Sequence, residues 1–324
     1  MLDGTINGPD EDEFDCDLAV ETLCSAFQEL STDDKAIIDV LVSHSNEQRQ
    51  QIKKSFRTKH EKNENLRDVI TQEFGGHFLE ATLALLQAPL TFDAHCIRRH
   101  IKRKKIVDSC LVDLFLLREW DEREAIVDTY YQAYGQTLAS DILSCGDFHP
   151  HLLELLNAKR PMHQNEIDLE MAQKDAEVLR KAGVDILGAD LPVFKVIICQ
   201  RSFAQIQATF ATYEKTFGRT VEADFHVRGD FRDGLIRIVQ LIKDPVEAYA
   251  IQLGKALGED VVTRNNVDDE ELIRILVTRS EIDLEAIKNQ FAKRYHRSLV
   301  QSIREVTHGE YAHLLVKIVE PNSF

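Results

Sequence analysis

The segment LIRILVTRSEIDLEAIKNQF (272–291) combines an apolar run, a serine suited to beginning a helix, and a second apolar series. The members of the second series recur at the spacing of one helix face: Ile282, Leu284, Ile287 and Phe291. Ser280, with Asp283 three residues later, has the form of a helix N-cap with its acceptor at the third helical position. The segment therefore predicts two consecutive helices joined by a short turn at the serine.

The same pattern occurs four times along the chain, with an anchor residue at the end of each apolar run. The anchors are His44, Arg118, Arg201 and Arg279. Twelve residues after each anchor is an aromatic side chain: Phe56, Tyr130, Tyr213 and Phe291. Two further caps are predicted at Ser45 with Gln48 and at Ser202 with Gln205, whereas Glu119-Trp120 breaks the pattern. Agreement at four places predicts an internal repeat of about 75 residues.

Each repeat also ends in a strongly apolar helix, such as FLEATLALLQ (78–87) or YAHLLVKIV (311–319), and about five short helices fit in each. Scarce Gly and Pro and frequent charged residues also favour an all-α fold. We predict repeats at 16–89, 90–160, 173–245 and 246–324, a polar linker at 161–172, and an acidic tail at 1–15 that is disordered. An α-solenoid of the HEAT or armadillo type is the alternative, but its repeats use two or three helices.

The composition limits the classes of function. The chain has 39 basic and 55 acidic residues, a net charge of −16, so a nucleic-acid-binding role is disfavoured and binding to an anionic membrane needs a cationic bridge. Six scattered cysteines favour a reducing compartment. No signal peptide and no apolar run of about 18 residues are present. No catalytic motif occurs, so we expect a non-enzymatic cytoplasmic protein.

The chain resembles the annexin family over nearly all of residues 16–320. The segment 272–291 looks like the fourth annexin repeat, and VETLCSAFQELSTDDKAIIDVLVSHSNEQRQQIKKSF (20–56) is similar to the first. The resemblance implies four five-helix repeats in a slightly curved disc, with calcium loops on its convex face. It also implies calcium-dependent binding to anionic phospholipids such as phosphatidylserine, peripheral to membranes. In the family, a K-G-x-G-T loop offers carbonyls, and a carboxylate follows about 40 residues later.

The third repeat retains most of this family pattern. Gly183 and Gly188 match the two loop glycines, and carbonyls of Gly183, Ile186 and Gly188 are the expected ligands. Asp230, in GDFRDG (229–234), is the expected carboxylate. The alternative is that both glycines only cap and bend a helix end.

The first repeat has lost both family glycines, to Glu29 and Ser31, but keeps Thr32, Asp34 and the distal acid Glu73. Carbonyls of Phe27, Glu29 and Ser31 are the ligands that the resemblance implies. The alternative is that residues 31–34 simply begin a helix.

The second and fourth repeats depart further from the family. In the second, four cations would repel calcium: Lys102, Arg103, Lys104 and Lys105. They either contact lipid phosphates or another polyanion directly or form a solvated basic run. The acid position of the second repeat falls near Leu143, and that of the fourth is Val306. The fourth repeat has an acidic insertion (258–271). Its carboxylates either form a cation site unrelated to the family or favour the start of a helix. They belong to Glu259, Asp260, Asp268 and Asp269.

Two functions remain open from the sequence. The first is calcium-dependent binding to anionic phospholipid membranes, with fewer calcium sites than a typical annexin. The second is a calcium-independent scaffold or polyanion-binding protein that uses the basic loop 102–105. Protein partners are expected at the N-terminal tail, and no specific nucleic-acid partner is expected.

Overall fold

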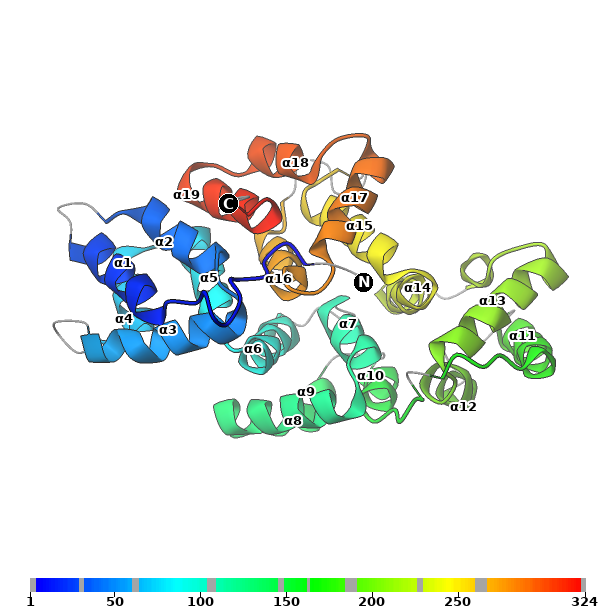
Figure 1. The fold of residues 1–324 in the computed structure, drawn as a ribbon. Helices are drawn as coiled ribbons and strands as arrows, with labels where there is room; N and C mark the ends of the chain where they lie inside the picture. Colours follow the sequence, from blue (N-terminus) through cyan, green and yellow to red (C-terminus); the bar gives the residue numbers. More distant parts are fainter. Residues whose placement is uncertain are drawn as a thin grey trace. The chain divides into compact units, whose positions relative to one another are not determined.

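The computed structural model describes residues 4–28, 32–59, 64–103, 109–144, 149–161, 164–183, 191–225, 230–259 and 267–321. These residues form helices and connections and contain no β-strand (Figure 1). They divide into two compact units, one made of Met1–Phe92 with Val246–Phe324 and the other of Asp93–Pro245. The all-α prediction is confirmed.

The first unit is formed by the two ends of the chain. Its N-terminal part contains α1 (Cys16–Gln28), α2 (Asp34–Val42), α3 (Asn46–Lys59), α4 (Leu66–Glu73) and α5 (Gly76–Leu86). Its C-terminal part contains α15 (Pro245–Ala256), α16 (Asp269–Arg279), α17 (Leu284–Tyr295), α18 (Leu299–Val306) and α19 (Gly309–Val319). Helix α19 packs against α2, α5 and α16, so the apolar helices predicted to end the first and last repeats share one core.

The second unit is formed by the middle of the chain. Its first part contains α6 (Pro89–Lys102), α7 (Ser109–Leu117), α8 (Trp120–Tyr134), α9 (Leu138–Ile142) and α10 (His149–Leu156). Its second part contains α11 (Leu169–Gly183), α12 (Leu191–Phe194) continued by a π-helix (Lys195–Cys199), α13 (Phe203–Phe217), a 3₁₀ turn (Val221–Asp224) and α14 (Asp230–Lys243). Helix α7 packs against α10 and α14. The prediction of about five helices in each repeat is confirmed.

After three of the four anchors, a side chain caps the start of the next helix. The Ser45 hydroxyl accepts from the Gln48 backbone N–H, and the Gln48 side chain accepts from the Ser45 N–H at 2.9 Å, so this cap is as predicted. Ser202 accepts from the Gln205 N–H at 3.2 Å. The helix after the second anchor, where Glu119-Trp120 departs from the predicted pattern, is also capped, because the Glu122 carboxylate accepts from the Glu119 N–H at 2.8 Å.

The predicted cap at Ser280 is wrong. Ser280 is fully buried at the end of α16, and α17 begins only at Leu284. Asp283, expected to accept a backbone N–H, instead forms two hydrogen bonds of 2.8 and 2.6 Å with the Arg279 guanidinium. The Ser280 carbonyl accepts from the backbone of Thr5 at 2.6 Å and of Ile6 at 2.9 Å. A long-range contact has replaced the local cap.

The predicted disorder of the N-terminal tail is also wrong for residues 4–15. Ile6 is 1% exposed, and the Thr5 hydroxyl donates to the Ile318 carbonyl of α19 at 2.6 Å. The Gln48 amide of α3 donates to the Pro9 carbonyl at 2.8 Å. Gly8 has φ +71, and a Cβ on it would lie 2.2 Å from the Gln48 side chain. The segment is therefore a fitted part of the first unit, despite its acidic composition.

Replacing Thr5 by valine is expected to lower the free energy of unfolding of the first unit by about 1–2 kcal/mol. The change keeps the shape of the side chain but leaves the buried Ile318 carbonyl with one donor fewer. Denaturant unfolding and the rate of proteolysis within residues 4–15 would measure the effect. Thr22→Val is the matched control, because the Thr22 hydroxyl is exposed and bonds only within α1. Equal effects in the two variants would contradict a docked segment.

Candidate functional site

The first-repeat loop brings together two residues that are 41 positions apart in the sequence. Glu73 ends α4, and Thr32 lies in the connection between α1 and α2. The Thr32 hydroxyl donates to the Glu73 carboxylate at 2.9 Å. Asp33 accepts from the Ala36 N–H at 3.0 Å and so caps α2. The distal acid therefore lies against the proximal loop, and the alternative reading of these residues as a helix start also holds.

Carboxylates crowd this loop. Partial burial raises the pKa of Asp34, and the negative charges of Glu310, Asp33 and Glu73 raise it further. Glu310 is in the first turn of α19, so the last repeat contributes negative charge to the first-repeat loop. A bound cation would relieve this repulsion, which makes the loop electrostatically suited to calcium.

Aromatic packing fixes the position of the loop. The Phe27 ring, near the end of α1, lies 6.1 Å from the Phe56 ring and 6.4 Å from the Phe74 ring. Phe74 follows Glu73, so this contact holds the end of α1 beside the carboxylate. This role of Phe74 was not predicted, because an aromatic residue after an acid has no specific spacing in the sequence. Glu29 and Ser31 lie outside the described residues.

The third-repeat candidates lie at the ends of two helices. Gly183 is the last residue of α11, and Asp230 is the first residue of α14. Ile186 and Gly188 lie outside the described residues. The third-repeat ligand set remains a prediction.

The second-repeat cations continue from the end of a helix. Lys102 is the last residue of α6, Arg103 follows it, and both are exposed. Lys104 and Lys105 lie outside the described residues. Cations at a helix C-terminus interact favourably with the helix dipole, so this placement fits the solvated reading as well as a lipid contact. Leu143, at the position of the missing acid, is 58% exposed at the end of α9.

The acids of the fourth repeat have structural partners. Asp268 caps α16 by accepting from the Glu271 N–H at 3.1 Å. Asp269 accepts from the Tyr311 hydroxyl at 2.8 Å, and Glu259 is paired with Arg297 at 3.3 Å. Asp260 lies outside the described residues. These contacts favour the helix-start reading over a separate cation site.

The described residues contain neither a compact metal-ligand cluster nor a membrane-spanning helix. Within the described ranges, no group of three or more His, Cys, Asp or Glu side chains is arranged to hold a metal by itself. A loop that supplies backbone carbonyls and one carboxylate does not need such a group. None of the helices in those ranges is long and apolar enough to cross a membrane.

Comparison with protein families gives one matching model. The model, described as Annexin, matches residues 19–85, 174–238 and 256–318. These segments fall within the predicted first, third and fourth repeats.

Individual relatives match almost the whole chain. Annexin A13 of Mus musculus is 33% identical over 310 residues, which are 94% of this chain and 95% of that protein. Annexin A11 of Homo sapiens is 34% identical over 98% of this chain, and the match spans 62% of that longer protein. The solved structure of annexin III has a TM-score of 0.86 at 30% identity, covering 99% of this chain and 98% of its own. Chicken annexin V in complex with Zn²⁺ has a TM-score of 0.88 at 29% identity, covering 99% of each chain.

Proposed function

Because the chain belongs to the annexin family, whose general function is calcium-dependent phospholipid binding, we propose that it binds anionic phospholipid surfaces through calcium held in its inter-helix loops. The observation that carries the proposal for this chain is the hydrogen bond between Thr32 and Glu73. It joins the two halves of a family-type loop around a carboxylate in a negatively charged setting.

Hard-cation chemistry explains how such a loop would work. Calcium takes six to eight oxygen ligands, and a loop with a few carbonyls and one carboxylate leaves positions for water and a lipid phosphate oxygen. The protein itself carries a net charge of −16 and is repelled by an anionic surface. A calcium ion shared by the loop and the phosphate would reverse that repulsion at the point of contact.

The four loops would contribute unequally. We assign the third repeat, through Gly183, Ile186, Gly188 and Asp230, as the main site, and the first repeat, through its carbonyls with Glu73, as a weaker one. Loss of both loop glycines weakens the first site, because residues other than glycine disfavour positive φ. Leu143 and Val306 stand where the second and fourth repeats would need a family-type carboxylate, and the basic run 102–105 repels calcium in the second, so the capacity for calcium is reduced.

Co-sedimentation with phosphatidylserine vesicles, with calcium titrated against a chelator, tests the proposal. Pelleting is expected to require calcium. Asp230→Asn should raise the calcium concentration needed by about tenfold, a loss of roughly 1.4 kcal/mol, and Glu73→Gln by less. Glu214→Gln, an exposed change on α13 outside the loops, is the control. Absence of pelleting at millimolar calcium would overturn the proposal.

The same assay tests the calcium-independent alternative. Pelleting that persists in chelator, weakens with salt and disappears when Lys102–Lys105 are neutralised would favour direct contact of the basic run with lipid phosphate. Protein partners at the N-terminal tail are also a proposal, and residues 10–13 form the longest exposed run within its described part.

A further inference from the structure

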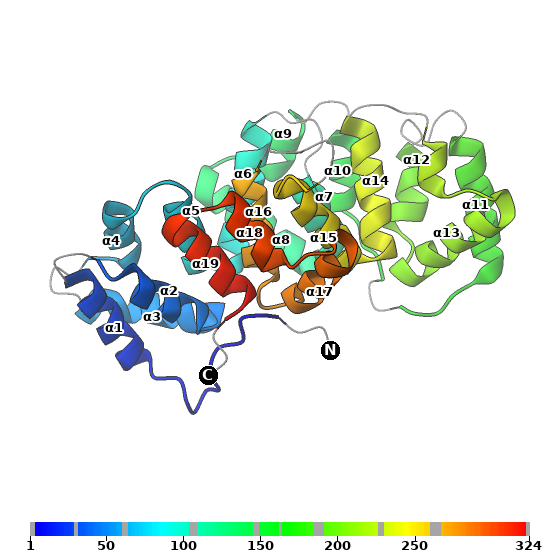
Figure 2. The same ribbon diagram turned by 90° about the horizontal axis from the view of Figure 1, so that it is seen from above.

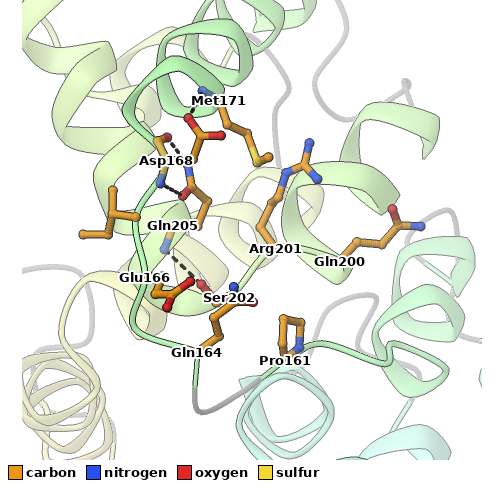
Figure 3. Close-up of a pocket in the computed structure, with 10 residues that line it drawn as sticks. Pro161, Gln164, Glu166, Asp168, Met171, Gln200, Arg201, Ser202 and Gln205 are labelled. Atoms are coloured by element: carbon orange, nitrogen blue, oxygen red, sulfur yellow. Dashed lines mark hydrogen bonds between the residues drawn. The ribbon is translucent and has the colours of Figure 1, made fainter.

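Four cations gather on one surface of the first repeat, in a protein that is otherwise strongly acidic. Lys54 and Arg57 on α3 and Arg67 on α4 are exposed, and Lys53 on α3 is half-buried. We call these four residues the α3–α4 basic face. Helices α3 and α4 are in contact, and the two ribbons are adjacent in both views (Figures 1 and 2). Residues 53 and 57, and 54 and 57, are helix neighbours at spacings of four and three.

Within the described ranges, the cations of this face are not paired with carboxylates. No carboxylate among the described residues forms an ion pair with any of the four, whereas the nearby Lys59 pairs with Asp17 at 2.9 Å. The Lys53 ammonium donates to the Leu86 carbonyl at the end of α5 at 3.0 Å and to the Gln50 side chain. Burial lowers the pKa of Lys53, and the positive charge of Arg67 lowers it further. The four charges of the face therefore repel one another, and among the described contacts only that of the Lys53 ammonium holds the fold.

The other repeats lack this face at the equivalent positions. The three α3 positions correspond, by distance from the anchor, to Val127, Asp128 and Tyr131 in the second repeat, to Phe210, Ala211 and Glu214 in the third, and to Lys288, Asn289 and Ala292 in the fourth. Arg67 is the second residue after the cap of its helix, where the others have Ala139, Glu222 and Val300. Lys288, the only cation in these sets, is paired with Glu285 at 2.6 Å. The scaffold does not require cations here.

We propose that the α3–α4 basic face binds a compact polyphosphate anion, either free or as the phosphorylated headgroup of a lipid. Guanidinium groups bind phosphate oxygens in pairs, and ammonium groups add point charges. Lys53, already held by Leu86 and Gln50, supplies a fixed charge at the inner edge, while Lys54, Arg57 and Arg67 can adapt to the ligand. Two or more adjacent phosphates match four clustered positive charges.

This face is separate from the first-repeat calcium loop. Arg67 is near the start of α4 and Glu73 is its last residue, about 9 Å further along the helix axis at the usual rise of 1.5 Å per residue. Binding at the face needs no calcium, so it can be measured in chelator, where the proposed calcium sites are empty. Failure of one proposal leaves the other intact.

Calorimetric titration with tripolyphosphate in chelator tests the inference on the full-length protein. Binding is expected, and the triple variant K54Q/R57Q/R67Q should weaken it by more than about tenfold, since each cation near a phosphate contributes about 1 kcal/mol. The matched control K215Q/K255Q/K293Q removes three exposed lysines, on α13, α15 and α17, that are paired with no carboxylate in the part of the chain that the structure describes. It should bind as the parent does.

A second arm separates the sources of phosphate. Vesicles of phosphatidylcholine with a phosphoinositide bisphosphate are offered in chelator beside the free anion. Binding of both, lost in the triple variant alone, supports a headgroup site, and binding of tripolyphosphate alone supports a soluble ligand. Binding of neither, or equal loss in the triple variant and its control, overturns the proposal.

Discussion

Replacing Asp113 by alanine is expected to lower the free energy of unfolding of the second unit by about 3–5 kcal/mol. Asp113 is the only charged residue of α7 and is 1% exposed. Its two carboxylate oxygens accept from the Arg237 guanidinium of α14 at 2.7 and 2.9 Å. The alanine variant removes the carboxylate to which the 5% exposed Arg237 donates, and the cost is that of a buried charge that loses this counter-charge.

A double variant separates two energies: the loss of the ion pair itself, and the burial of the Arg237 charge after Asp113 has been removed. Asp113→Leu with Arg237→Met removes both charges, and its stability should lie within about 1 kcal/mol of the parent or above it, because a buried ion pair gains little over apolar packing. Urea unfolding, followed by circular dichroism, gives both values. If the double variant is as unstable as Asp113→Ala, the pair itself stabilises the helix contact and the explanation by an isolated charge is wrong.

Protonation of His151 is expected to lower the free energy of unfolding by about 2–3 kcal/mol when the pH falls from 6.5 to 4. His151 is 4% exposed in α10, and its ring meets the Phe194 ring edge-on at 4.7 Å. Burial lowers its pKa from 6.5 to about 4, and nearby Glu154 only partly opposes this. Between these values the unfolded chain binds a proton that the folded chain does not. The contribution is therefore complete above pH 6.5 and lost progressively on acidification.

Comparison with His151→Leu isolates this effect from the other groups that titrate in the same range. The free energy of unfolding is measured at pH 7 and pH 4.5 for both proteins. The decrease on acidification should be smaller in the variant by about 2 kcal/mol. Equal decreases would show that His151 is protonated in the folded protein as readily as in the unfolded chain.

Local patterns predicted the fold well because the repeat is built from short-range signals. The aromatic twelve residues after each anchor is fully or nearly fully buried at Phe56, Tyr130, Tyr213 and Phe291. The caps at Ser45 and Ser202 form because hydroxyl and backbone N–H are only three residues apart. Such features depend on helical geometry alone, so one copy of the repeat predicts the next.

The errors arose where distant segments compete with local geometry. Ser280 has the sequence of a cap, but its carbonyl binds Thr5, and Asp283 is taken by Arg279. The acidic tail has a disordered composition, yet its Ile6 side chain is buried and backbone hydrogen bonds to Ser280 hold the segment in place. Composition averages over a segment, whereas docking depends on one or two side chains.

The candidate site was predictable only in part for the same reason. The pairing of Thr32 with Glu73 follows from the spacing of the family loop. The negative charge that Glu310 adds comes from another repeat, and no spacing along the sequence relates the two. The basic face of α3 and α4 is equally hidden, because its members are ordinary helix residues until the two helices are brought together.

The docked N-terminal segment determines the order in which the two units fold during synthesis. Thr5 is synthesised before its partners Ser280 and Ile318, which lie 275 and 313 residues further along the chain. The first unit is completed only when both of its segments have been synthesised, whereas the second unit is continuous and can fold earlier. Closing contacts across about 275 residues adds an entropic cost, so the last quarter of the chain should govern the time at which the N-terminus becomes protected.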